Sequence, residues 1–207
     1  MRLASLLEIV GDEPVFETGW LLAGDVDPAD VRRQLSRWVK GGRLHQLRRG
    51  LYALAPPYEK TRPHPFLVAN RLLRGSYVSL QSALAYHGLI PEYVPVTTSV
   101  TTGRPQRREN PFGSFEYHHV PAGALTGYRL EALGEGQEAL VATPAKALAD
   151  LVHLVPGGDS QAYLSELRLQ GLKRIDPAEL QDHPVLGRRP KLRRALRRLA
   201  ALSEEGR

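Results

Sequence analysis

Apolar residues recur at helical spacing in several stretches of the chain. Leu3, Leu6, Leu7 and Val10 fall on one side of a helix, which predicts a helix over residues 2–10 that ends at Gly11. Similar spacing and start signals predict further helices over residues 28–40, 66–73, 80–87 and 161–170, one that opens at residue 144, and one over residues 190–202.

Other stretches alternate or are rich in Val and Thr, which is typical of strands. Residues 43–47 and 51–54 read as two strands joined by the turn Arg48-Arg49-Gly50. Residues 75–78 are predicted to form a short extended segment. Residues 94–102 and 115–120 are predicted to be strands joined by a basic loop over 103–113. Residues 128–132 and 138–142 read as a hairpin. The chain therefore mixes helices and strands.

The helix over residues 28–40 has strong boundaries and two chemically different faces. Asp27-Pro28 is a favoured helix start, and Gly41-Gly42 a favoured stop. One face carries Val31, Leu35, Trp38 and Val39, so Trp38 is expected in the core and not as a stacking platform for bases. The opposite face carries Arg33, Ser36, Arg37 and Lys40, with Arg32 at its boundary.

The order of elements predicts the domain organisation. A basic helix, a basic turn and an apolar strand follow one another in the order that a winged helix-turn-helix requires. We predict a winged helix-turn-helix DNA-binding domain over residues 1–57, a proline-rich linker over 58–65, and a second domain over 66–207. The predicted class is α+β, with a mixed α/β domain following the winged helix.

Composition supports a polyanionic partner. The chain has 207 residues, a net charge of +6 and a pI near 9.8. The charge is clustered, because residues 31–50 hold seven Arg and Lys residues and no acidic residue. The chain contains no Cys, which excludes disulfides and thiolate metal sites. No apolar window approaches the ~20 residues of a membrane span, so we expect a cytoplasmic protein without a membrane partner.

The clustered charge indicates contacts to double-stranded DNA. Arg33 and Arg37 lie one helical turn apart and can enter one major groove, while the turn at Arg48 and Arg49 can hold phosphates. The alternative is a solvated helix face with cations near its C-terminus, which accounts for Lys40 alone. The predicted DNA-binding residues are Arg32, Arg33, Ser36, Arg37, Lys40, Arg43, His45, Arg48 and Arg49.

A second basic site has two parts, in the loop over 103–113 and in the last helix. The leucines of the last helix can pack on the domain while its arginines face solvent, an alternative as good as a role in binding nucleic acid or a partner protein. The residues are Arg104, Arg107, Arg108, Arg193, Arg194, Arg197 and Arg198.

No motif predicts catalysis or metal binding. His118 and His119 are adjacent in a strand, so their side chains point to opposite faces. Asp150 lies in a mostly apolar helix, where a side-chain cap or an arginine partner explains it better than catalysis does. Nucleophile elbows, P-loops and Rossmann glycine patterns are absent from the sequence. We therefore predict no enzyme activity, no catalytic residues, no metal and no cofactor.

Three segments together resemble a known family. WVKGGRLHQLRRGLYAL, then YVSLQSALAYHGLIPEYVPVTTSVTTGRPQRRENPFGSFEYHHV, then ATPAKALADLV are similar to the AbiEi family of antitoxins, in the family order and over roughly residues 15–154. These antitoxins belong to type IV toxin–antitoxin systems of abortive infection, a form of phage defence. One departure is the segment ETGWLLAGDVDPAD, which lacks a clear second helix before the basic helix.

The resemblance implies a function and partners. It implies an N-terminal winged helix-turn-helix, a C-terminal α/β antitoxin domain, and repression of the protein's own operon through inverted repeats in promoter DNA. It also implies a nucleotidyltransferase-like toxin, leaving open whether antitoxin and toxin touch, and a monomer or a dimer formed on DNA. The positions that match the family's DNA-binding segment are Arg32, Arg33, Arg37, Lys40, Arg48 and Arg49.

Two alternatives stay open. A stand-alone winged-helix transcriptional regulator would share the N-terminal features and carry a sensing C-terminal domain. A nuclease acting through Asp150 or the histidines is the third hypothesis, and it belongs to a different class of protein.

Overall fold

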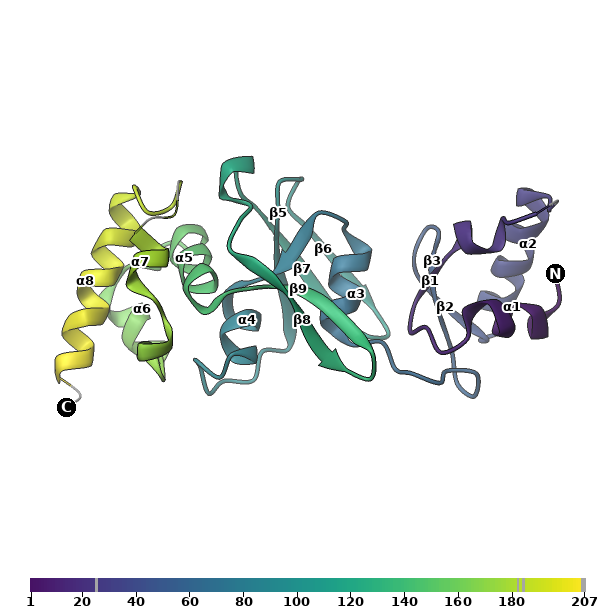
Figure 1. Cartoon of the computed structure of the whole chain (residues 1–207), viewed down its shortest axis with the longest axis horizontal. Helices are drawn as coiled ribbons and strands as arrows, with labels where there is room; N and C mark the ends of the chain where they lie inside the picture. Colours follow the sequence, from purple (N-terminus) through teal and green to yellow (C-terminus); the bar gives the residue numbers. More distant parts are fainter. Residues whose placement is uncertain (25, 182, 184, 206–207) are drawn as a thin grey trace.

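The computed structural model describes residues 1–24, 26–181, 183 and 185–205 (Figure 1). The chain folds into an elongated molecule of mixed helix and strand content, with helices and a small sheet at one end, a larger sheet in the middle and a group of helices at the other end. The expected mixture of helices and strands is therefore observed.

The N-terminal unit, residues 1–55, surrounds its own hydrophobic core. Its elements are α1 (Leu3–Val10), β1 (Phe16–Glu17), the 3-10 turn η1 (Thr18–Leu21), α2 (Pro28–Lys40), β2 (Leu44–Arg48) and β3 (Leu51–Leu54). The strands form an antiparallel sheet in the order β1-β3-β2. Leu6, Phe16, Leu35 and Trp38 are buried together, so the prediction that Trp38 belongs to the core is confirmed.

A six-stranded sheet occupies the middle of the molecule, in the order β6-β7-β5-β4-β9-β8. Pairs β4–β9 and β5–β7 are parallel and the other three are antiparallel. The strands are β4 (Ser76–Val78), β5 (Val96–Thr101), β6 (Gln106–Asn110), β7 (Gly113–His119), β8 (Tyr128–Gly134) and β9 (Gln137–Ala142).

Helices cover this sheet and extend to the C-terminal end (Figure 1). They are α3 (Pro65–Leu72), α4 (Leu80–Tyr86), α5 (Pro144–Leu154), α6 (Gln161–Glu166), α7 (Pro177–Gln181) and α8 (Pro190–Glu205), with 3-10 turns η2 (Ala122–Ala124) and η3 (Leu172–Arg174). Helix α5 is buried on almost every side, because α4, α7, α8 and β9 all pack against it.

Several sequence predictions were wrong in detail. The basic loop over 103–113 contains β6, which pairs with β7. The helix expected over 161–170 ends at Glu166, and η3 and α7 were not predicted. Serine before residue 80 predicts an N-cap for α4, and Ser79 does occupy that position, but its side chain makes no cap hydrogen bond and donates to Asp150 instead. A polar partner elsewhere in the core competes with capping for a short hydroxyl.

The segment between the two sheets is held against the central body. The backbone N–H of His64 donates to Gln137 Oε1 at 2.8 Å, and Gln137 Nε2 donates to the carbonyl of Arg62 at 3.0 Å. Val15, Leu47 and Leu51 pack into the larger hydrophobic core of the central body. The N-terminal unit is therefore docked as well as tethered.

Candidate nucleic-acid interface

Helix α2 presents a polar, basic face to solvent. The Asp27 carboxylate accepts a hydrogen bond from the Ala29 N–H at 2.8 Å, and Pro28 starts the helix, so the capping prediction is confirmed. Val31, Leu35 and Trp38 anchor the opposite face in the core. This anchoring leaves one row of side chains accessible over the length of the helix: Arg32, Arg33, Ser36, Arg37 and Lys40.

Charge on this face is uneven. Arg33 forms an ion pair with Asp30 one turn earlier, and this hydrogen bond raises the pKa of Arg33. Within the described chain, Arg32, Arg37 and Lys40 form no ion pair. The excess positive charge is therefore greatest toward the C-terminal half of α2.

The predicted DNA-binding residues on the hairpin after α2 do not all face the same way. Arg43 and Arg49 are exposed at its two ends. His45 instead packs edge-on against the ring of Phe112, with ring centroids 5.7 Å apart. Because Phe112 lies between β6 and β7, this side of the hairpin faces the central body.

Arg48 is not at a free wing tip, contrary to our prediction. Its Nε donates to the carbonyl of Arg71 at 3.2 Å, its Nη1 donates to the carbonyl of Arg49 at 3.1 Å, and Nη2 lies 3.7 Å from Glu17. Both carboxylate oxygens of Glu17 also accept hydrogen bonds from Arg74 Nη2, each at 2.7 Å. Sequence alone could not show this, because Arg71 and Arg74 are distant in the chain.

The parts of the predicted second basic site are partly neutralised. In β6, Arg107 pairs with Glu109 and lies 3.5 Å from Glu116, and Arg108 donates to Gln106. In α8, Arg194 pairs with Asp159 at 2.7 Å and Arg198 contacts the same residue. Four members stay exposed without an ion pair in the described chain, namely Arg104, Arg108, Arg193 and Arg197.

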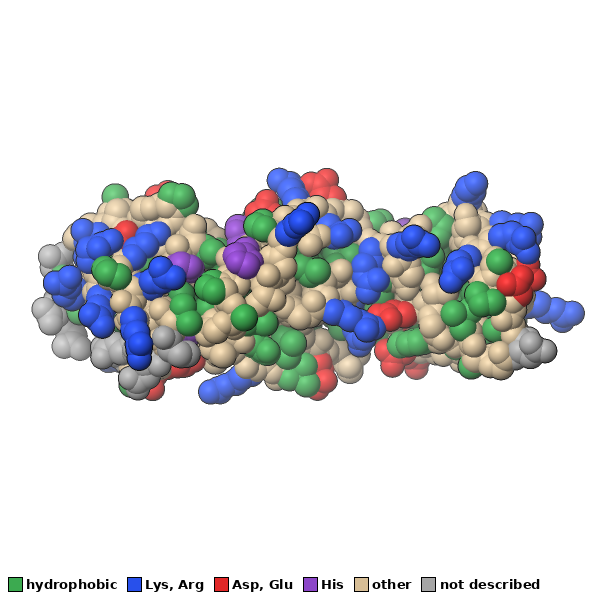
Figure 2. Space-filling view, turned by 90° about the horizontal axis from the view of Figure 1, so that it is seen from above, with side chains coloured by type: hydrophobic (Ala, Val, Ile, Leu, Met, Phe, Trp, Pro, Cys, Tyr) green, Lys and Arg blue, Asp and Glu red, His purple; other side chains and the backbone are tan. Residues whose placement is uncertain are grey.

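Lys and Arg side chains lie over the C-terminal helices, over the N-terminal unit and also on the central body between them (Figure 2). Leu192, Ala195 and Leu199 of α8 are buried, so the expected packing of this helix on the domain is observed for these residues. The N-terminal unit and the C-terminal helices lie at opposite ends of the molecule, with the central sheet between them (Figure 1).

No family model matches the chain, and no curated protein matches its sequence. The chemistry of its residues and the resemblance given above are therefore the basis for a functional proposal.

A buried polar cluster joins α5 to the central sheet. Asp150, fully buried, accepts hydrogen bonds from the Tyr77 hydroxyl at 2.9 Å, the Ser79 hydroxyl at 2.8 Å and the Lys146 ammonium at 2.6 Å. Burial raises the pKa of Asp150 and lowers the pKa of Lys146, and the ion pair between them opposes both shifts. Both side chains are at most 1% exposed to solvent.

Lys146 was not predicted as the partner of Asp150; an arginine or a cap was expected there. The spacing of Lys146 and Asp150 by four residues on one helix was the available signal. Tyr77 and Ser79 gave no such signal, because only the fold brings β4 against α5.

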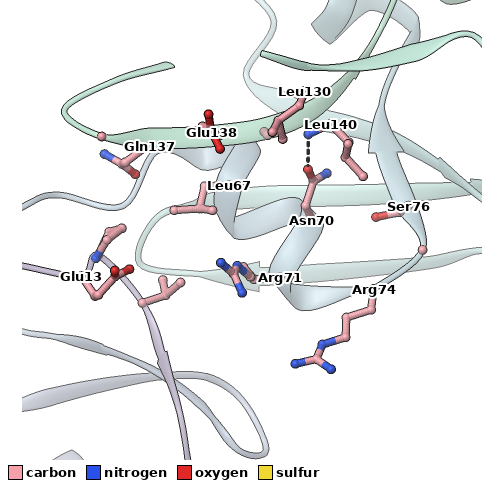
Figure 3. A pocket seen from close by; sticks show the side chains of 15 residues that line it. Glu13, Leu67, Asn70, Arg71, Arg74, Ser76, Leu130, Gln137, Glu138 and Leu140 are labelled. Carbon is pink, nitrogen blue, oxygen red and sulfur yellow. Dashed lines mark hydrogen bonds between the residues drawn. The ribbon is translucent and has the colours of Figure 1, made fainter. Parts of the chain in front are cut away.

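A cleft of about 480 Å³ lies between the N-terminal unit and the central sheet (Figure 3). Glu13, Leu130 of β8, and Asn70, Arg71 and Arg74 of the α3 region are among its lining residues. Asn70 Oδ1 accepts from the N–H of Leu140 at 2.6 Å, while its buried Nδ2 has no partner among the described residues. The guanidinium groups of Arg71 and Arg74 extend away from this bond in Figure 3.

Metal ligands do not gather in the described part of the chain. No group of three or more His, Asp or Glu residues there has the geometry to hold a metal ion. His119 is occupied by a contact of 3.0 Å between its Nδ1 and the carbonyl of Gly103. No helix among the described residues has the length and apolar character to cross a bilayer.

Proposed function

We propose that the protein binds double-stranded promoter DNA through α2, as an autorepressing antitoxin of the AbiEi type. The observation that carries the DNA-binding part is the accessible face of α2, where Arg32, Arg37 and Lys40 form no ion pair within the described chain and Arg43 follows them. An α-helix fits the major groove, where Arg recognises guanine and Lys pairs with phosphate.

The arrangement of the N-terminal unit supports a winged helix-turn-helix. Helix α1, the short turn η1 and helix α2 precede an antiparallel hairpin in a three-stranded sheet of order β1-β3-β2. The turn η1 stands where a second helix is expected, in the segment that departs from the family pattern. We propose α2 as the recognition helix, with Arg43 and Arg49 on flanking phosphates and Arg48 as a docking residue.

The antitoxin part of the proposal rests on the family resemblance. Its three segments extend from α2 through the sheet to α5, so the central body is our candidate for neutralising a nucleotidyltransferase-like toxin. The alternative, a regulator with a sensing domain, is favoured by the cleft beside Arg71 and Arg74, because ligand sites occur preferentially between domains. We propose no enzyme activity, since the Asp150 cluster is closed to solvent.

A binding titration with the protein's own upstream DNA tests the proposal. Replacing two basic side chains by Arg37→Ala with Lys40→Ala should weaken binding about 30- to 700-fold, at roughly 1–2 kcal/mol per side chain. The slope of log K against log salt should also fall by about 0.9 for each phosphate that is no longer neutralised.

The matched control removes the same charge elsewhere. Lys60→Ala with Lys173→Ala neutralises two exposed lysines away from α2 and should leave the affinity within about threefold. DNA binding that is absent at low salt, or that weakens equally in both double variants, would reject α2 as the recognition helix.

A further inference from the structure

The two edges of the central sheet differ in chemistry. The β6 edge carries three successive charged residues, Arg107, Arg108 and Glu109, so both of its faces are charged. Charges on an edge strand discourage pairing with another strand. The β8 edge lacks this protection on one face, where Leu130 is 59% exposed.

Backbone groups on β8 point alternately toward β9 and toward the open edge. The Thr143 N–H donates to the Gly127 carbonyl at 2.9 Å, which fixes the phase of the antiparallel ladder. Arg129 and Glu131 therefore direct their N–H and C=O groups toward β9, and Leu130 directs both groups outward. The outward carbonyl of Ala132, which takes a contact of 3.5 Å from the Tyr86 hydroxyl, agrees with this phase.

Side chains on β8 are complementary to a second copy of the same strand. If two copies of β8 pair antiparallel about a twofold axis at Leu130, Arg129 of each copy lies opposite Glu131 of the other. Placing the axis at Arg129 or at Glu131 would instead bring identical charges together. Opposite charges across a strand pair stabilise it and like charges destabilise it, so the sequence favours the axis at Leu130.

The outward N–H and C=O groups of β8 can form hydrogen bonds in this same register. About an axis at Leu130, the outward N–H and C=O of Leu130 meet those of the second copy and exchange two hydrogen bonds. Tyr128 lies opposite Ala132, whose carbonyl keeps its Tyr86 contact because a carbonyl oxygen accepts two hydrogen bonds. Neither Arg129 nor Glu131 forms an ion pair within the described chain, so both are available.

We infer that two copies of this chain dimerise by antiparallel pairing of β8 with β8, which makes one continuous sheet across the dimer. The contact is one strand wide, smaller than the ~1,600 Å² of a standard stable interface, so it is weak and depends on concentration. A twofold dimer also suits inverted repeats in DNA. The inference goes beyond the proposed function and does not depend on it.

Sedimentation equilibrium of the full chain without DNA, up to a concentration on the order of 100 μM, tests the dimer. Arg129→Glu and Glu131→Arg should each raise the dissociation constant roughly tenfold or more, since each turns two opposite-charge pairs into like-charge pairs. The double variant R129E/E131R should recover association. An equimolar mixture of the two single variants should form a heterodimer, in which both pairs are again opposite in charge.

Two further variants separate this surface from general effects of charge or folding. Arg104→Glu makes the same charge change on an exposed loop and should leave the dimer intact. Leu130→Pro removes an outward N–H that β9 does not use, so it should abolish the dimer while the thermal transition remains cooperative.

Two results would overturn the inference: a wild-type chain that stays monomeric over the whole range, or a dimer that neither single charge reversal weakens. Recovery in neither the double variant nor the mixture would also reject the pairing. Loss of DNA binding in α2 variants would leave all of these results unchanged, so the two proposals fail separately.

Discussion

At the scale of single residues, the Lys146–Asp150 pair illustrates why a buried charge is retained. Asp150 has three hydrogen-bond donors around it, and Lys146 has a carboxylate partner in return. Taking both charges out of water costs several kcal/mol per ion, and their attraction offsets this only when the remaining bonds are made. Removing one partner should therefore cost more than removing both.

We predict that Asp150→Asn lowers the free energy of unfolding by about 3–5 kcal/mol, because it leaves the Lys146 ammonium buried without its counter-charge. Lys146→Met should cost a similar amount. The double variant that carries both of these changes should cost clearly less than the sum, giving a large coupling energy in a double-mutant cycle. Urea unfolding at pH 7 measures all four proteins, and additive effects would show that the pair is not coupled.

At this scale, a residue's role could be predicted from the sequence when its partners were close to it in the chain. The buried position of Trp38 followed from helical spacing within α2, because its partners repeat every three to four residues. The contacts of Arg48 with Arg71, and of Asp150 with Tyr77 and Ser79, were not predictable, since only the fold brings these distant residues together.

At the scale of elements, α2 depends on its first turn. Asp27 caps the helix, Pro28 fixes its first residue, and Asp30 adds a negative charge near the N-terminus, where the helix dipole favours one. These local signals explain why the predicted bounds of α2 were confirmed. Strand β6 was missed because its charged residues read as a loop, and only pairing with β7 makes it extended.

We predict that Asp27→Ala destabilises the N-terminal unit by about 1 kcal/mol, within a range of roughly 0.5–2, because the Ala29 N–H loses its acceptor. Asp27→Asn keeps an oxygen acceptor and should change stability by only a few tenths. Tryptophan fluorescence during denaturation reports on this unit, since both tryptophans of the chain, Trp20 and Trp38, lie in it. Equal stability of the alanine variant and the wild type would contradict a capping role.

At the scale of the whole molecule, the N-terminal unit is fixed to the central body by polar and aromatic contacts. Glu17 bridges Arg48 and Arg74, Arg48 reaches the backbone of Arg71, and His45 meets Phe112. This docking sets the direction in which α2 faces, so in the proposed complex it also sets which part of the hairpin can reach DNA. Composition indicated a basic, DNA-binding chain, but it could not indicate this orientation.

We predict that Glu17→Ala with Arg48→Ala loosens this docking without unfolding either unit. Partly exposed ion pairs contribute about 0–1 kcal/mol each, so the docked population should fall while the melting transition of the central body changes little. Limited proteolysis should then cleave within residues 56–63 faster, and the radius of gyration in solution should rise. Arg168→Ala, which removes the remote ion pair with Glu92, is the control and should change neither quantity. Unchanged proteolysis in the double variant would mean that the apolar contacts of Val15, Leu47 and Leu51 hold the two parts together by themselves.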